Sequence, residues 1–400
     1  MLNSGFSDWP SFSLEEAEAV RSVLLSNKVN YWTGQECRNF EKEFAVFAGV
    51  EHAVAVANGT VALDLALKVL DLCDGDEVVV TPRTYFATVS SIVNAGLTPV
   101  FADINPISQN VDADTIERVI SNKTKALICV HLAGWPCEMD PIMKLAKKFD
   151  LYVIEDCAQA HGAKYKGKSV GSIGDIGCWS FCQDKIITTG GEGGMVTTNN
   201  VSLWDAMWSF KDHGKSWNAI YKHEHSSGFR WVHDTFGSNW RMTEIQGAIG
   251  RLQLSRLESW QAQRNAYSKQ IKQAANETKH LFAYDLSCMG CHGSCDADTG
   301  CRDGSYKCYV FVNGVKSKRD QIMNAIGQEG VPCFQGTCPE VYLEKAFEKT
   351  TFRPKQRLPV AKKLGDTSLM FMCHPTLTQA EIDHTCATII KIGNSEDFNQ

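Results

Sequence analysis

The sequence predicts an α/β protein with a large domain built on a mostly parallel sheet and a smaller C-terminal α+β domain. Short apolar segments of strand type alternate with helix-length segments through the first half of the chain, and this order is typical of a parallel sheet covered on both faces. A chain of 400 residues also exceeds what one hydrophobic core normally holds. We therefore expect domains over residues 1–260 and 261–400, connected by a long amphipathic helix over about 240–272.

Helix start signals and apolar periodicity define the elements of the large domain. Ser13 with Glu16 predicts a capping box before a helix that ends near Ser26, and a second helix runs from about Gln35 to Phe47. The strands expected after these helices are 52–57, 77–80, 99–102, 126–130, 151–154, 176–181 and 195–199. The helices expected between them are 58–70, 84–94, 113–120, 141–149 and 201–211.

The last third of the chain has a different pattern. Residues 306–315 alternate as a sheet strand does, and residues 318–329 have the length and composition of a helix. Thr378 with Glu381 predicts a capping box at the start of a final helix. These elements give the smaller α+β domain.

Charge and hydropathy exclude several classes of protein. The net charge of −6 is spread without long runs of one sign, so there is no electrostatic footprint for nucleic acid or an anionic membrane. The N-terminus lacks the basic and apolar regions of a leader peptide, and no apolar run approaches the roughly 20 residues that span a bilayer. We expect a cytoplasmic enzyme that binds neither nucleic acid nor membrane.

Most of the 16 cysteines stand singly in apolar segments, where a free thiol behaves as a small core residue, so a disulfide scaffold is not expected. One glycine-rich segment differs, because it holds Cys288, Cys291, Cys295, Cys301 and Cys308 together with His292. This spacing is compatible with zinc or an iron–sulfur cluster. No second Cys-x-x-Cys follows at zinc-finger spacing, so a loop with free thiols or local disulfides is favoured and no metal ligand is assigned.

The segment 212–237 is polar and rich in histidine, lysine and tryptophan. Its histidines have no regular metal-ligand spacing. We interpret it as a surface or interface loop.

Residues 151–194 carry the strongest indication of chemistry. An apolar strand ends in Glu155 and Asp156, with Gln159 after it, and the next strand is followed by Lys185 and the glycine-rich run 190–194. Open α/β sheets bind ligands at the carboxyl ends of their strands. A lysine between an apolar strand and a glycine turn is placed to be a Schiff-base nucleophile, although a lysine considered alone is usually a solvated surface charge.

Two other strand ends add candidate binding groups. Gly59 and Thr60 begin a helix after a strand, where free backbone N–H groups bind phosphate, although Asn58 or Thr60 could equally be an ordinary N-cap. Tyr85 and Phe86 follow the next strand and lie on the same rim of the sheet. Tyr85 could stack on a planar ring, although an aromatic residue at the start of an apolar helix more often packs in the core.

Five motifs, taken together, resemble the DegT/DnrJ/EryC1/StrS family of pyridoxal-phosphate-dependent sugar aminotransferases over about residues 10–260. They read NGTVAL, TYFAT, EDCAQAHGA, SFCQDKIITTGGEGG and GSNWRMTEIQGA. The resemblance implies a type I aminotransferase fold and a homodimer whose active sites lie at the subunit interface. The cofactor then alternates between pyridoxal phosphate and pyridoxamine phosphate.

The resemblance also implies a role for each matching residue. Lys185 would form the Schiff base, Asp156 would pair with the pyridine nitrogen, Gln159 would lie near the phenolic oxygen and Tyr85 would stack on the ring. Gly59, Thr60 and Ser180 would bind the phosphate, with Asn239 reaching in from the partner chain. TPRTYFAT is one residue shorter than the usual turn, which leaves Tyr85 and Phe86 as alternatives for the stacking residue.

The implied reaction moves an amino group from glutamate to a nucleotide-linked keto sugar, at C4 by preference with C3 as the rival, for a surface polysaccharide or related glycan. Lys185 argues against the dehydratase branch of the family, in which a histidine replaces that lysine. Two alternatives are a non-catalytic regulatory or sensory protein of the same fold and a protein with a metal or iron–sulfur site at the cysteine-rich segment.

Overall fold

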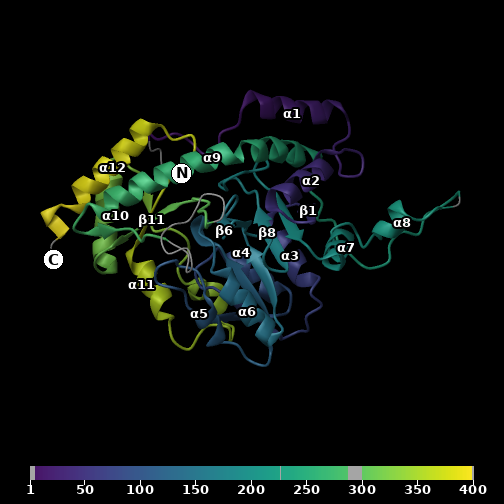
Figure 1. Ribbon diagram of the computed structural model, residues 1–400, viewed down its shortest axis with the longest axis horizontal. Helices are drawn as coiled ribbons and strands as arrows, with labels where there is room; N and C mark the ends of the chain where they lie inside the picture. The colour runs from purple at the N-terminus through teal and green to yellow at the C-terminus, as the bar shows by residue number, and fades with distance from the viewer. Residues whose placement is uncertain (1–4, 226, 287–299, 399–400) are drawn as a thin grey trace.

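The computed structural model describes residues 5–225, 227–286 and 300–398. Its centre is a seven-stranded sheet in the order β1-β9-β8-β5-β4-β2-β3 (Figure 1). The strands are β1 (His52–Val56), β2 (Glu77–Val80), β3 (Thr98–Phe101), β4 (Thr124–Val130), β5 (Tyr152–Asp156), β8 (Ile176–Ser180) and β9 (Gly194–Thr198). The run from β8 to β3 is parallel, and β9 pairs antiparallel with both β1 and β8. The mostly parallel sheet expected from the sequence is confirmed.

The expected helices are present in order, with shifts at their ends, and two further helices, Trp217–Tyr221 and Pro359–Thr367, were not expected. They are α1 (Leu14–Leu25), α2 (Glu36–Ala48), α3 (Gly59–Lys68), α4 (Phe86–Asn94), α5 (Ala113–Glu117), α6 (Met139–Phe149), α7 (Val201–Phe210), α8 (Trp217–Tyr221), α9 (Glu244–Asn276), α10 (Lys316–Gln328), α11 (Pro359–Thr367) and α12 (Gln379–Gly393). The capping boxes of Ser13 and Thr378 are both present. Helix α4 begins at Phe86 rather than Thr84, because Tyr85 has an extended backbone.

The strands of the large sheet bury both faces, as the two-residue period of a strand requires. In β2, Val78 and Val80 join the core under α3 and α4, whereas Val79 joins the core under α5 and α6. A third core lies between the sheet and α2, where Phe40 and Phe44 pack against the β8 side of the sheet. The sheet is therefore fixed on both faces, and its strand ends form a stable rim.

A second sheet of four antiparallel strands lies in the C-terminal part of the chain. Its strands are β10 (Leu281–Phe282), β11 (Cys308–Val312), β12 (Cys333–Phe334) and β13 (Ser368–Phe371). Residues of α9, α10 and α12 complete its core. Helix α9 is 33 residues long and passes along both sheets (Figure 1). The domain boundary expected near residue 260 falls inside α9 and stays a prediction.

A small two-stranded sheet, β6 (Lys164–Tyr165) with β7 (Lys168–Ser169), lies between β5 and β8 in the chain. Four short 3₁₀ segments are η1 (Leu132–Gly134), η2 (Val341–Leu343), η3 (Lys345–Phe347) and η4 (Glu396–Phe398). The sequence indicated neither set, since such short elements carry no periodicity.

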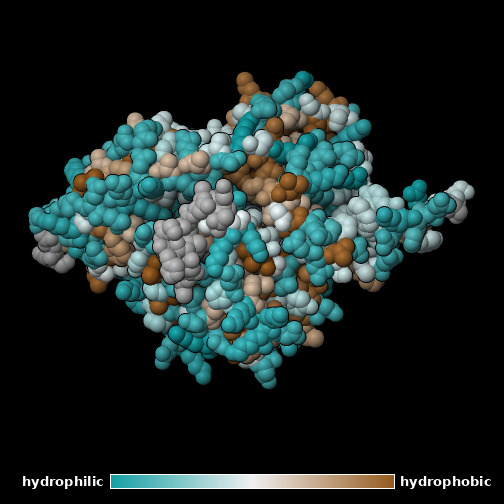
Figure 2. Space-filling model, viewed as in Figure 1, coloured by the Kyte–Doolittle hydropathy of each residue, from teal (hydrophilic) through white to brown (hydrophobic). Residues whose placement is uncertain are grey.

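Residues 212–237, which we call the arm, include α8, and the described part of this segment extends away from the rest of the molecule (Figure 1). Phe229, Trp231 and Phe236 of the arm are exposed. Figure 2 shows that hydrophilic side chains cover most of this face of the molecule and that the arm projects well beyond it. The structure confirms that this segment lies at the surface.

Cys288, Cys291, Cys295 and His292 lie outside the described residues. Cys308 is buried in β11, where its thiol donates a hydrogen bond to the Ser268 carbonyl at 3.6 Å. Counting Cys308 as part of one cysteine-rich loop was therefore wrong, because its side chain belongs to the core of the second sheet. Among the described residues no helix has both the length and the apolar character needed to cross a membrane.

Candidate active site

The largest cavity described here, about 840 Å³, lies where β5, β8 and the start of α3 meet the second sheet. Seven of the eight residues expected at a cofactor site line it, namely Gly59, Thr60, Tyr85, Asp156, Gln159, Ser180 and Lys185. They meet because the carboxyl ends of parallel strands share one edge of a sheet. A cavity of this size lies within the range that holds small-molecule ligands.

Lys185 follows β8 in a loop that the glycine turn folds back onto the sheet. The N–H of Phe181 donates to the carbonyl of Gly193, and Gly190 and Gly191 have φ of 87° and 125°, which favours glycine. The Lys185 side chain is only 16% exposed, and its Nζ lies 3.5 Å from Oδ1 of Asp184. Its Nζ also lies 5.2 Å from the centre of the Tyr306 ring. Lys185 is therefore held inside the cavity, and the interpretation as a solvated surface charge is wrong.

Asp156 ends β5 and is almost fully buried. Its Oδ1 accepts a hydrogen bond from the Ala158 N–H at 3.1 Å, and its Oδ2 accepts one from the Thr88 hydroxyl at 2.9 Å. Burial raises the pKa of Asp156, and the bonds from Ala158 and Thr88 and the charge of Lys185 offset only part of that rise. A cationic N–H facing this carboxylate would therefore stabilise its ionised form, which burial disfavours. Thr88 reaches Asp156 from α4, and no local sequence signal marks this residue.

The start of α3 forms a close-packed cradle beside Ser180. A Cβ added to Gly59 would lie 2.5 Å from the Ser180 Cβ, so only glycine lets the helix approach this strand. Asn58 is the N-cap, accepting from the Val61 N–H at 2.9 Å. Among the described residues, nothing accepts the N–H of Gly59 or of Thr60. The N-cap interpretation is thus correct for Asn58, and it still leaves two donors for an anion at a helix N-terminus.

Tyr85 and Gln159 present polar and aromatic groups to the same cavity. Tyr85 lines it and is 71% exposed, whereas Phe86 is partly buried and packs on Phe347. A core position for Tyr85 is therefore wrong, and Tyr85 rather than Phe86 is available for stacking. The Oε1 of Gln159 accepts from the Ala133 N–H at 2.9 Å, which directs its amide group toward the cavity as a donor.

Asn239, the eighth expected residue, does not line this cavity. It is exposed and pairs with Asp212 at the base of the arm. Arg241 fixes this base through an ion pair to Oδ1 of Asp212 at 2.6 Å. A single chain therefore brings together every expected site residue except Asn239.

Comparison with known proteins connects this geometry to a family. Residues 10–390 match the DegT/DnrJ/EryC1/StrS aminotransferase family. The chain belongs to that family. The resemblance drawn from the five motifs is confirmed, and it extends well beyond residue 260.

Relatives of this aminotransferase act on nucleotide sugars. The chain is 35% identical over 391 residues to a GDP-perosamine synthase of Escherichia coli O157:H7, covering 95% of this chain and 96% of that one. It is 34% identical over 368 residues to a UDP-N-acetyl-3-dehydro-alpha-D-glucosamine 3-aminotransferase of Acidithiobacillus ferrooxidans, covering 92% and 91%. A crystal structure of an aminotransferase from Psychrobacter cryohalolentis is similar with a TM-score of 0.93 and 55% identity, over 97% of this chain and 98% of that one. The protein is an aminotransferase of nucleotide sugars.

The cofactor of this aminotransferase is pyridoxal phosphate. Solved relatives contain this cofactor in its pyridoxal phosphate or its pyridoxamine phosphate form. The residues present fit that group. The glycine-lined start of α3 offers unpaired N–H donors for a phosphate, and the buried Asp156 offers a carboxylate for a ring N–H. Lys185 adds an amine to the same cavity that Asp156 and the start of α3 line.

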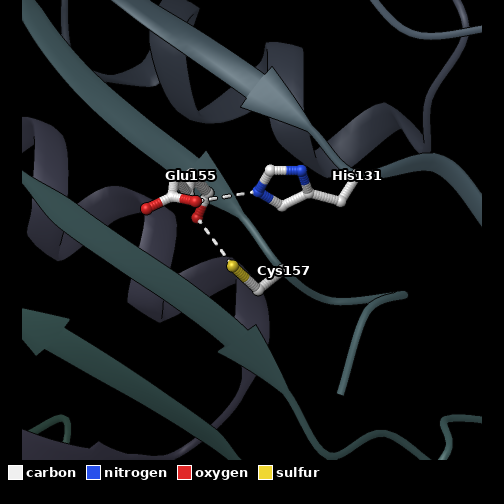
Figure 3. A group of neighbouring side chains, drawn as sticks. All are labelled: His131, Glu155 and Cys157. Atoms are coloured by element: carbon white, nitrogen blue, oxygen red, sulfur yellow. Dashed lines mark hydrogen bonds and ion pairs between the residues drawn. The ribbon is translucent and has the colours of Figure 1, made fainter. Parts of the chain in front are cut away.

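A buried group of side chains lies at the ends of β4 and β5, on both sides of Asp156 in the sequence. His131, Glu155 and Cys157 converge in this group (Figure 3), with their ligand-type atoms within 4.8 Å of one another. Nδ1 of His131 accepts from the Cys137 N–H at 3.0 Å, so Nε2 carries the proton and donates to Glu155 at 3.0 Å. The other oxygen of Glu155 accepts two backbone N–H groups. Because these groups already satisfy one another, we interpret the cluster as a rigid support for the end of β5 rather than as a metal site. His131 directly follows β4 and is fully buried.

Proposed function

We propose that this aminotransferase takes an amino group from glutamate and transfers it to a nucleotide-linked keto sugar, with the ketone at C4 by preference and at C3 as the rival. The observation that carries the proposal is that Lys185 and Asp156 line one cavity together with the phosphate cradle at Gly59 and Thr60. The product would be an amino sugar for a surface polysaccharide or a related glycan. A cytoplasmic location remains a prediction from the sequence.

Each residue has a role that follows from its position. Pyridoxal phosphate, when bound, draws electrons from the substrate bond that breaks, provided its ring nitrogen stays protonated. Asp156 keeps that proton in place, because burial favours a cation beside its carboxylate. Lys185 Nζ would hold the cofactor and, as a free amine, would move a proton between carbon atoms. Gly59, Thr60 and Ser180 hold the phosphate, Tyr85 stacks on the ring and Gln159 donates toward the phenolic oxygen.

A homodimer with shared active sites is part of the proposal. Asn239 lies outside the cavity of its own chain, at the base of an arm whose Trp231 and Phe236 are 86% and 99% exposed. Exposed aromatic side chains on a projecting segment are typical of a surface that another chain covers. We infer that the arm packs on a second copy and presents Asn239 to the phosphate there. Sedimentation analysis of the purified protein tests this, and a stable monomer with full activity would contradict it.

The donor half of the reaction can be tested in a spectrometer. The purified protein should show the visible absorption of lysine-bound cofactor, and glutamate should bleach it by forming the amine form. Lys185→Ala should abolish turnover without unfolding the protein. Substantial residual transamination in this variant would overturn the assignment of Lys185.

The acceptor half requires keto sugars. The 3-aminotransferase among the relatives supports C3 and the family resemblance supports C4, so nucleotide sugars with a ketone at each carbon should be offered to the amine form of the enzyme. NMR of the product then identifies the carbon that carries nitrogen. We expect amination at C4. Turnover confined to 3-keto sugars would show that C3, and not C4, is the carbon that is aminated.

A further inference from the structure

Lys307 is a cation of the cavity to which the reaction described above gives no role. It directly precedes β11 and lines the same cavity as Lys185. Among the described lining residues, Lys185 and Lys307 are the lysines, and there is no arginine or histidine. Lys185 is occupied by the cofactor, so Lys307 is the cation left for other anions.

Lys307 forms no ion pair among the residues that the structure describes. Its Nζ donates to the thioether sulfur of Met372 at 3.3 Å, and sulfur is a weak acceptor. No carboxylate lies within ion-pair distance of Nζ among the described residues. Asp184, an acid of the same cavity, is already bonded to the Tyr306 hydroxyl and lies 3.5 Å from Lys185. The face of the Tyr306 ring, 4.9 Å away, compensates only part of the cost of desolvation.

Lys307 and Lys185 lie against the same aromatic ring of the cavity. The Nζ of Lys307 is 4.9 Å and that of Lys185 5.2 Å from the centre of the Tyr306 ring. A substrate in this cavity therefore has both amines among its neighbours. Burial lowers the pKa of Lys307 to about 8, because the charge of Asp184 compensates only part of the desolvation of the ammonium group.

We propose that Lys307 binds an anionic oxygen group of a substrate of this aminotransferase. The inference rests on the proposed function, which assigns Lys185 to the cofactor. Two substrates carry such a group, since a dicarboxylic amino donor has a second carboxylate and a nucleotide sugar has a diphosphate. In either case an oxyanion replaces the sulfur of Met372 as the principal acceptor of Lys307.

Calorimetric titration of the cofactor-loaded protein separates the two sources. Glutarate is the probe for the donor, because it has both carboxylates of glutamate and no amine, and UDP and GDP are the probes for the nucleotide. Lys307→Met should lower the affinity for one of the two classes of probe by roughly tenfold or more, because hydrogen bonds to charged groups are stronger than those between neutral groups. Loss of glutarate binding assigns Lys307 to the donor, and loss of nucleotide binding assigns it to the acceptor sugar. Lys307→Arg should retain most of the affinity.

Controls keep the test decisive. Lys316→Met removes an exposed lysine at the start of α10, and Lys307→Gln replaces Lys307→Met if the latter lowers the thermal midpoint. In kinetics, KM for the assigned substrate should rise while the other half-reaction is unchanged. Equal binding of both probe classes by Lys307→Met and Lys316→Met would overturn the inference. Because the titration needs no turnover, failure to aminate any keto sugar would refute the acceptor part of the proposed function and not the role of Lys307.

Discussion

The indole Nε1 of Trp9 donates a hydrogen bond at 2.9 Å to the backbone carbonyl of Lys185, 176 residues away in the sequence. The Trp9 ring packs edge to face on Trp260 and beneath the guanidinium of Arg264. The N-terminal segment therefore holds the loop that carries the catalytic lysine. This contact fixes where the lysine backbone lies in the cavity.

Trp9→Phe keeps the aromatic packing and removes the donor to Lys185. We expect the free energy of unfolding to fall by about 1–3 kcal/mol, because a partly buried carbonyl loses its partner, and kcat to fall several-fold. Chemical denaturation and the glutamate half-reaction measure the two effects. Trp260→Phe is the matched control, since the same exchange there touches no bond of Lys185. Equal losses of kcat in both variants would argue against the positioning role of Trp9.

Asp156→Asn replaces the buried carboxylate with an amide of the same shape. Turnover should fall by roughly 100-fold or more, because an amide does not hold a proton on the ring nitrogen as a carboxylate does. The cofactor should remain bound, since the groups at Gly59 and Lys185 are untouched. Steady-state kinetics and the visible spectrum check both points.

Thr88→Val provides a graded comparison for Asp156. It removes only the hydroxyl that donates to Oδ2 of Asp156, so we expect a smaller loss of turnover than in Asp156→Asn. If Thr88→Val were as damaging as Asp156→Asn, the hydroxyl would have a role beyond supporting the carboxylate.

Gly59→Ala introduces a methyl group where α3 meets β8. The new Cβ would lie 2.5 Å from the Ser180 Cβ and 2.8 Å from its Oγ, so the helix start must move. We expect weaker retention of the cofactor on dialysis and a lower thermal midpoint. Gly327→Ala is the control, because a Cβ there meets nothing within 4 Å and alanine favours helix α10 by up to about 1 kcal/mol. Unchanged cofactor affinity in Gly59→Ala would mean that the start of α3 does not bind the phosphate.

His161 makes stability depend on pH. Its ring packs against Trp179 and Phe181, and burial, with the charges of Lys185 and Arg264, lowers the pKa of His161 to about 3. The unfolded chain takes up a proton below pH 6.5 whereas the folded protein does not, so stability is lost as pH falls below 6.5. The loss from this group amounts to up to about 2 kcal/mol between pH 6.5 and 5.

His161→Phe keeps a ring in place and removes the titration. Denaturation midpoints at pH 7 and pH 5 should therefore differ less in this variant than in the unchanged protein. His374, whose pKa burial also lowers to about 3, accounts for part of the dependence that remains. An unchanged difference between the two midpoints would contradict the assignment to His161.

The sequence by itself determined the order along the chain of the strands and helices of the large domain. It also determined most of the residues that line the cavity proposed to hold the cofactor. Asp156 ends a strand of that sheet, and Gly59, Gln159 and Lys185 each follow a strand within a few residues. Parallel strands bring their carboxyl ends to one rim whatever the details of packing. Local signals are sufficient for this, because the period of a strand, a capping residue and a glycine turn are each read within a few residues.

Only the tertiary structure decided which distant residues complete the site. Trp9, Thr88, Tyr306 and Lys307 reach the cavity or Lys185 from the N-terminal segment, from α4 and from the start of the second sheet. Their own neighbours in sequence do not mark them, because long-range packing has no local periodicity. Long-range packing also decides the environment of His131. This residue follows the end of β4 and forms a buried pair with Glu155 instead of lining the cavity.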